Sequence, residues 1–143
     1  MIYLGADHRG FELKNAIKTY LNEKGIAATD LGADQFLPDD DYPDYARDVA
    51  HAVLGDPGSF GILACGAGHG MCIQANRFKG IRAILGATEI LTERGRSHNN
   101  ANILVLDADF EGDAKAIVDI FLDTPFDTHP RHLRRIRKLD EPL

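Results

Sequence analysis

The chain has 143 residues, of which 44% are hydrophobic and 27% are charged, and its formal net charge is −6. A chain of this size fits a single domain, residues 1–143, with a substantial core, and its acidic balance disfavours broad nucleic-acid binding, which relies on basic surfaces. No apolar run approaches the ~20 residues that cross a bilayer, and the first residues lack the basic segment of a signal peptide. The two cysteines, Cys65 and Cys72, make no disulfide framework, so we expect a reduced, cytoplasmic protein.

Apolar runs and apolar residues at helical spacing alternate along the chain. The first run predicts a short strand, and the helical pattern that follows it stops at Gly25, a typical helix end. In chain order, the expected strands are 1–5, 26–31, 60–65, 81–85 and 103–106, and the expected helices are 11–21, 45–53, 71–77, 88–96, 114–122 and 129–139. Two polar connections stand out. We interpret the acidic cluster 39–41 as a solvated turn that favours the next helix start, and residues 97–102 as a loop.

This alternation predicts an α/β fold: a three-layer α/β/α, Rossmann-like domain with a five-stranded parallel sheet. Right-handed crossovers place every strand-to-helix turn at one edge of such a sheet. Asp7 and His8 follow the first strand, the loop 65–70 follows the third, and His98 and Asn99 lie in the loop that leads to the fifth. We expect these three polar segments to converge on one pocket.

The segment that follows the third strand is rich in glycine, with Gly66, Gly68 and Gly70 alternating after Cys65. Glycines at a tight turn let backbone N–H groups approach a ligand closely. The helix that begins there adds partial positive charge, so the loop suits an anion or a developing oxyanion. It is not a dinucleotide fingerprint, because Met71 stands where the third glycine would be. Cys65 is either a small buried hydrophobic residue or a base or nucleophile with a depressed pKa.

Two further polar segments admit a structural or a chemical role. Asp7 and His8 either cap the first helix or present a carboxylate and an imidazole to a polyhydroxylated or phosphorylated ligand. Their turn is not a P-loop, because Phe11-Glu12 replaces the Lys-Ser/Thr pair of that motif. His98 is suited to proton transfer near neutral pH, and Asn99 either binds a ligand beside it or only forms a turn.

The end of the chain is locally basic within an acidic protein. Arg131, Arg134, Arg135 and Lys138 recur at helical spacing and share one face of the last expected helix. This face is either solvated or a phosphate clamp, because guanidinium groups match phosphate oxygens in geometry and charge. No spacing of histidines, cysteines and carboxylates resembles a Zn²⁺ or Ca²⁺ site, so we expect no metal.

Six motifs occur in an order that resembles ribose-5-phosphate isomerase B and its relatives, which include galactose-6-phosphate isomerase subunits. They are Asp7-His8-x-Gly10-Phe11, Asp41-Tyr42-Pro43, Cys65-Gly66-x-Gly68-x-Gly70, Asn76-x-Phe78-x-Gly80-Ile81-Arg82-Ala83, His98-Asn99 and Arg131-His132-x-x-Arg135. The resemblance covers essentially the whole chain. It implies aldose–ketose isomerisation of a sugar phosphate through a cis-enediolate, without a metal or another cofactor.

The same resemblance implies a role for each matching residue. Cys65 would be the base that moves a proton between C1 and C2 of the sugar, and His98 the acid that opens the furanose ring, with Asp7 near the same hydroxyls. Backbone N–H groups of the glycine-rich loop would hold the enediolate oxygen, and Asn99 would bind sugar hydroxyls. The substrate-binding positions would also include His8, Arg131 and Arg135 at the phosphate, and Tyr42, Gly66, Ala67, Gly68, His69 and Gly70 around the sugar.

In relatives the active site lies between two subunits, with the arginine-bearing tail serving the neighbour. The resemblance therefore implies a homodimer or a dimer of dimers with shared active sites, in which the helix at 129–139 packs on a neighbouring subunit. The expected partners are a small sugar phosphate and further copies of the chain, with no nucleic acid and no membrane.

Three segments depart from the family pattern. Ala67 stands where relatives usually have Thr or Ser, His69 stands at a usually aliphatic place, and Asp107-Ala108-Asp109 replaces a Gly-x-Arg segment whose arginine contacts the phosphate. A carboxylate at 109 repels a phosphate unless it points away and Arg134 or Arg9 compensates. Three functions stay open: an isomerase of ribose 5-phosphate, an isomerase of another four- to six-carbon sugar phosphate, and a non-catalytic subunit that binds a phosphosugar.

Overall fold

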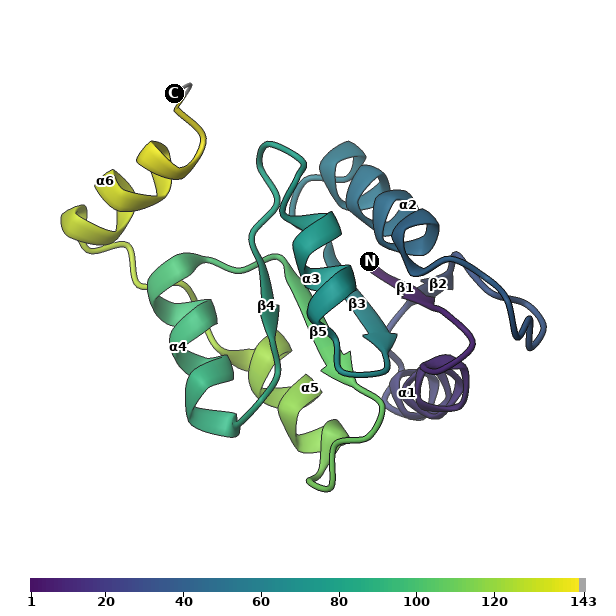
Figure 1. The fold of residues 1–143 in the computed structure, drawn as a ribbon. Coiled ribbons are helices and arrows are strands. Elements are labelled where there is room, and N and C mark those ends of the chain that lie inside the picture. Colours follow the sequence, from purple (N-terminus) through teal and green to yellow (C-terminus); the bar gives the residue numbers. More distant parts are fainter. Residues whose placement is uncertain (142–143) are drawn as a thin grey trace.

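The structure is a computed structural model that describes residues 1–141. Strands and helices alternate along these residues (Figure 1). The strands are β1 (Ile2–Ala6), β2 (Ala28–Asp30), β3 (Phe60–Cys65), β4 (Ala83–Leu85) and β5 (Ile103–Asp107), and the helices are α1 (Phe11–Glu23), α2 (Tyr42–Gly55), α3 (His69–Ala75), α4 (Glu89–Asn99), α5 (Ala114–Asp123) and α6 (Pro130–Leu139). None of the helices within residues 1–141 has the length and apolar character needed to cross a membrane.

The strands form one parallel sheet in the order β2-β1-β3-β5-β4. Helices α1 and α5 cover one face, α2 and α3 cover the other, and α4 lies beside α5 (Figure 1). The expected three-layer α/β/α arrangement is therefore confirmed. The chain leaves β1 toward one side of the sheet and β3 toward the other, so these neighbouring strands define a topological switch point, where such sheets bind ligands.

Each face of β3 packs into its own core. Ile62 and Ala64 lie in the core shared with α1 and α5, together with Phe121, the largest fully buried side chain. Leu63 and Cys65 lie in the core shared with α2 and α3. Because side chains alternate between the faces of a strand, the Cys65 sulfur belongs to the side of the sheet on which α3 begins.

Most elements lie where the sequence predicts them, with shifts at their ends. β2 and β4 are shorter than expected, because fewer of their residues pair with β1 and β5. α2 begins earlier than expected, at Tyr42, since Pro43 is well suited to the first turn of a helix. α3 also begins earlier, at His69, directly after the left-handed Gly68.

The expected loop at 97–102 is wrong for its first residues. α4 continues to Asn99, so His98 and Asn99 occupy its last turn. Asn100 follows with φ +48°, the left-handed conformation that asparagine tolerates and that commonly ends helices. The left-handed conformation of Asn100 therefore ends the helix. The polar residues before it did not predict the position of the helix end.

α6 stands away from the sheet, at the upper left of Figure 1, and contacts the rest of the chain chiefly through α4. His132 is the one residue of this helix that is buried. Beyond its end, Asp140 accepts a hydrogen bond from the Gly80 N–H at 2.8 Å. A strongly amphipathic helix thus has little packing within its own chain.

Candidate active site

The turn after β1 and the loop after β3 lie against each other at the carboxyl ends of the two strands. Ala6 pairs with Ala64 in the sheet, and a Cβ added at Gly10 would lie 2.0 Å from the Ala64 carbonyl oxygen. Only glycine permits so close an approach. The structure thus brings the turn that carries Asp7 and His8 to the 65–70 loop, as the sequence predicts.

The glycine-rich loop turns sharply over the end of β3. Gly68 has φ +82°, a conformation that favours glycine, and the backbone N–H groups of Gly68 and Met71 lie near enough to the Cys65 sulfur to lower its pKa. Tyr42, from the first turn of α2, packs against Gly70, where an added Cβ would lie 2.5 Å from the Tyr42 ring. Backbone donors that converge on one buried atom can stabilise negative charge there.

Cys65 is buried, with 5% of its surface exposed. Burial raises the pKa of its thiol, the N–H groups of Met71 and Gly68 lower it, and the carboxylates of Asp7 and Asp107 raise it again, so that the pKa lies above its ordinary value. The expectation of a depressed pKa is wrong for the substrate-free chain, because burial outweighs the two N–H groups. At neutral pH the sulfur is a thiol.

Asp7 is buried and ties the first turn together. Its Oδ1 accepts hydrogen bonds from the backbone N–H groups of Arg9 and Gly10, both at 3.0 Å. Asp7 therefore orders the turn before α1, but the expectation that it caps the helix is wrong, because the N-cap residue is Gly10, which offers no side-chain hydrogen bond to the helix. The chemical interpretation is compatible with this position, since the carboxylate lies close enough to Cys65 to raise the thiol pKa.

Asp40 binds His8 although the two residues lie 32 positions apart in the sequence. Its Oδ1 accepts a hydrogen bond from the His8 backbone N–H at 3.0 Å and lies 2.8 Å from His8 Nδ1. The Asp40 side chain is only 6% exposed, so the interpretation of the acidic cluster as a solvated turn is wrong for this residue. Burial raises the Asp40 pKa, but the interactions with His8 and Tyr45 outweigh burial and hold the pKa below its usual range.

Arg9 and Asp109 form an ion pair at the mouth of the loop. Arg9 Nη2 lies 2.7 Å from Asp109 Oδ2, and both side chains are more than half exposed. The Arg9 guanidinium also lies 3.1 Å from the position that a Cβ of Gly66 would take, so it covers the loop. Asp109 is thus neutralised by one of the two arginines expected to compensate for it.

A pocket of about 250 Å³ opens on the other side of the loop. It lies between Ala67 and His69 of the loop and Asp107 at the end of β5. Asp107 pairs with Cys65 in the sheet register, and the neighbouring Ala108 N–H donates to the carbonyl oxygens of Cys65 and Gly66. The pocket therefore borders the strand ends at which Cys65 lies, although Cys65 is not among its lining residues.

His98 and Asn99 do not join this site within one chain. They lie at the upper end of α4 in Figure 1, whereas the carboxyl ends of the strands lie at the bottom. The expectation of one pocket for all three polar segments is wrong here. A connection that leads into a strand lies at the opposite edge of a parallel sheet from a turn that leaves one. Both side chains are exposed.

The end of α4 and the start of α6 form a second polar cluster. The rings of His98 and His132 stack with their centroids 4.9 Å apart and their planes at 7°. His129 Nδ1 accepts a hydrogen bond from the Arg131 N–H at 3.2 Å, and Arg131 and Arg135 are exposed. Within residues 1–141, no group of three or more His, Cys, Asp or Glu side chains is arranged to hold a metal ion.

Two residues of these clusters carried no role in the sequence analysis. Asp40 is one of three consecutive aspartates and contacts a residue 32 positions away, so no local pattern marks it. His132 stacks on His98 because α6 packs on α4. Its place inside the motif Arg131-His132-x-x-Arg135 was the only signal for it.

The sequence is similar to known proteins along nearly its whole length. The Ribose/Galactose Isomerase family matches residues 2–139. Ribose-5-phosphate isomerase B of Mycolicibacterium paratuberculosis is 40% identical over 142 residues, which cover 98% of this chain and 89% of that protein. The D-erythrulose-4-phosphate isomerase of Pectobacterium atrosepticum is 41% identical over 128 residues, which cover 88% of this chain and 84% of that protein.

Solved structures share the fold. A ribose 5-phosphate isomerase from Thermotoga maritima has 50% sequence identity and a TM-score of 0.93, with 99% of this chain and 97% of that chain covered. Ribose-5-phosphate isomerase B from Mycoplasma genitalium, solved with bound ribulose-5-phosphate, has 41% identity and a TM-score of 0.90, with 96% and 92% covered. The chain belongs to the ribose/galactose isomerase family.

Proposed function

We propose that this member of the ribose/galactose isomerase family interconverts ribose 5-phosphate and ribulose 5-phosphate, with Cys65 as the base. The observation that carries the proposal is the environment of the Cys65 sulfur. It is a buried thiol beside the switch point, and the backbone N–H groups of Gly68 and Met71 near it lower its pKa against the effect of burial. Relatives named ribose-5-phosphate isomerase B, one of them with bound ribulose-5-phosphate, support the choice of sugar.

The reaction moves a proton between two neighbouring carbons of the open-chain sugar. The Cys65 thiolate takes the proton from C2 of the aldose, and the electron pair moves to the carbonyl oxygen O1. The C2 hydroxyl passes its proton to O1, and the thiol returns its own proton to C1 to give the ketose. The enediolate formed in between must be stabilised as its charge develops. Backbone N–H groups of the loop Gly66–Gly70 provide that stabilisation, and no cofactor takes part. A reduced thiol fits a reducing compartment such as the cytoplasm.

The furanose ring must open before this step, and we assign ring opening to His98, with Asp7 near the same hydroxyls and Asn99 binding the sugar. Because the end of α4 lies at the far edge of its own sheet, His98 and Asn99 act at the Cys65 site of a second copy. The sparse packing of α6 within its chain supports this arrangement. The proposed assembly is a homodimer, or a dimer of such dimers, with α6 packed on the neighbouring subunit.

The phosphate lies away from the reacting carbons and orients the sugar. His8, from the same chain as Cys65, is one proposed ligand of the phosphate. Arg131 and Arg135 of the second copy are the others, since exposed guanidinium groups pair well with phosphate oxygens. Tyr42, Ala67 and His69 line the sugar site around the loop.

Turnover of ribose 5-phosphate by the purified protein in EDTA tests the proposal. We expect Cys65→Ser to lower kcat about 1,000-fold, within the range that general base catalysis contributes, with KM nearly unchanged. Cys72→Ser is the matched control, because Cys72 is the other free cysteine and its sulfur contacts the Ala83 carbonyl oxygen. A Cys65→Ser enzyme that works at the wild-type rate would contradict the assignment of the base.

A second candidate is an isomerase of another sugar phosphate with four to six carbons. Ala67 leaves room in the pocket beside the loop, and Asp109 adds a carboxylate near the loop, paired with Arg9. The similarity to a D-erythrulose-4-phosphate isomerase points the same way. A panel of four- to six-carbon sugar phosphates separates the candidates. Thermal stabilisation by a phosphosugar without turnover of any would instead indicate a non-catalytic binding subunit.

A further inference from the structure

The loop 31–41, between β2 and α2, carries a buried carboxylate near its end. Asp40 Oδ1 contacts both the backbone N–H and the ring Nδ1 of His8, at 3.0 and 2.8 Å. The Asp40 side chain is 6% exposed and that of His8 is 31% exposed. One carboxylate therefore fixes both the backbone and the ring of a residue at the edge of the proposed site, while the ring keeps access to a ligand.

This contact decides which ring nitrogen carries hydrogen. The Asp40 pKa lies below its usual range despite burial, so the carboxyl group is ionised at neutral pH and only accepts hydrogen bonds. His8 Nδ1 must then carry a hydrogen. The opposite ring nitrogen, Nε2, has no hydrogen-bond partner among residues 1–141. It is the ring atom that remains for a ligand.

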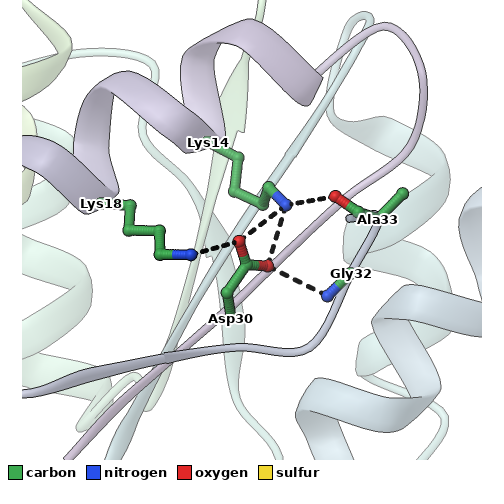
Figure 2. A network of polar contacts seen from close by, with 5 residues as sticks. All are labelled: Lys14, Lys18, Asp30, Gly32 and Ala33. Carbon is green, nitrogen blue, oxygen red and sulfur yellow. Dashed lines mark hydrogen bonds and ion pairs between the residues drawn. The ribbon is translucent and has the colours of Figure 1, made fainter. Parts of the chain in front are cut away.

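The start of the same loop is held by a buried ion pair, shown in Figure 2. Lys14 of α1 donates to both carboxylate oxygens of Asp30, at 2.8 and 2.9 Å, and to the Ala33 carbonyl oxygen at 2.7 Å. The Gly32 N–H donates to Asp30 at 3.0 Å, and the Gly32 carbonyl accepts from the Ala6 N–H at 3.0 Å. The loop is thus tied to α1 and β1 at one end and to His8 at the other, so its backbone presents Asp40 from a fixed position.

We propose that Asp40 is a positioning residue for phosphate recognition. It orients His8 so that Nε2 faces the phosphate, and its negative charge keeps a hydrogen on Nδ1. The charged neighbours in the same turn are engaged elsewhere: Asp7 by backbone N–H groups and Arg9 by Asp109. The inference rests on the proposed function, in which His8 is a phosphate ligand.

Asp40→Asn tests the inference, because it removes the charge and keeps the shape. We expect KM for ribose 5-phosphate to rise about tenfold or more, as for a lost hydrogen bond to a charged group, with kcat nearly unchanged. Asp39→Asn is the matched control, an exposed neighbour that should leave both constants unchanged. An unchanged KM, or a loss confined to kcat, overturns the inference.

A double-mutant cycle shows whether Asp40 acts through His8. If it does, adding Asp40→Asn to His8→Gln raises KM little beyond His8→Gln alone. Independent, multiplying effects of the two substitutions overturn the positioning role. Thermal unfolding of each variant confirms that the comparison is made between folded proteins.

Nitrogen-15 NMR of the histidine rings tests the same inference without an activity assay, because it shows which ring nitrogen of His8 carries hydrogen. We expect His8 in the wild type to carry hydrogen on Nδ1, and the Nε2 signal to shift when inorganic phosphate is added. Asp40→Asn should weaken that response and Asp39→Asn should not. If the wild type isomerises no sugar phosphate, the proposed function fails while this measurement still decides on Asp40. A His8 ring without hydrogen on Nδ1, or one that ignores phosphate, overturns the inference itself.

Discussion

The residues of the proposed site at the carboxyl edge of the sheet are buried or held by hydrogen bonds within the chain. The residues of the proposed site at the amino edge are exposed. Asp7 and Cys65 are buried, and His8 is held by Asp40. By contrast, His98 and Arg131 are exposed, and α6 has one buried residue. Base and oxyanion donors gain from a fixed geometry in every chain. Groups that close on the sugar from outside can take their position against a second copy.

The largest effect on stability should follow from removing the buried ion pair between Lys14 and Asp30, which supports the carboxyl edge. Lys14→Met leaves the Asp30 carboxylate buried with only Lys18 as a charged partner. The free energy of unfolding should therefore fall by about 3 kcal/mol, as for removal of one partner of a buried pair. Urea unfolding measures it. Lys18→Met, which removes the half-exposed partner, is the matched control and should cost less than about 1 kcal/mol. Equal losses of unfolding free energy in the two variants would contradict the claim that the buried Lys14 contributes more to stability than Lys18.

The burial of Cys65 should appear in the pH dependence of the reaction. Burial raises the pKa of the thiol, so the thiolate is the minor form at neutral pH and its fraction grows as pH rises. From pH 7 upward, kcat/KM should increase about tenfold per pH unit until the raised thiol pKa is reached. A plateau that begins at neutral pH would show that the free enzyme holds Cys65 as a thiolate.

Substitutions at the amino edge should change the binding of the phosphate, measured as KM, rather than the rate of the chemical step. Arg131→Ala removes an exposed guanidinium, so KM for a sugar phosphate should rise about tenfold while kcat changes little. Arg137→Ala is the matched control, because it lies outside the helix face that Arg131 shares with Arg134, Arg135 and Lys138. An equal change with an unphosphorylated sugar would remove the phosphate interpretation.

The smallest effect should come from the exposed ion pair between Arg9 and Asp109 beside the glycine-rich loop. Asp109→Ala frees Arg9 near the loop and removes a carboxylate from the approach of the phosphate. Exposed pairs are worth less than about 1 kcal/mol, so kcat/KM should rise by about two- to threefold. Glu111→Ala, an exposed acid on the same connection, should change less. A marked fall in activity would instead show that Asp109 holds Arg9 in its working position.

The sequence was sufficient for the fold because the signals that specify it are local. Apolar runs and glycines lie within a few residues of the elements that they predict, as at β3 and Gly68. The meeting of the β1 turn with the glycine loop also followed, since parallel strands place their carboxyl ends at one edge.

The rest of the candidate site depends on contacts between distant segments. The contact between Asp40 and His8 spans 32 positions, and burial reversed the expected direction of the Cys65 pKa shift. His98 was assigned to the wrong edge because the segment that carries it leads into β5, and such a connection lies at the opposite edge of the sheet from the turns that leave strands. Such features depend on packing, which no short pattern contains.

Mixing two inactive variants tests the shared site most directly. Cys65→Ser and His98→Asn chains should each be inactive alone. Refolded together in equal amounts, half of the dimers contain one chain of each kind, and one of their two sites keeps both groups. The mixture should therefore recover about one quarter of wild-type activity. No recovery, with mixed dimers present, would show that His98 serves the Cys65 of its own chain and would contradict the account.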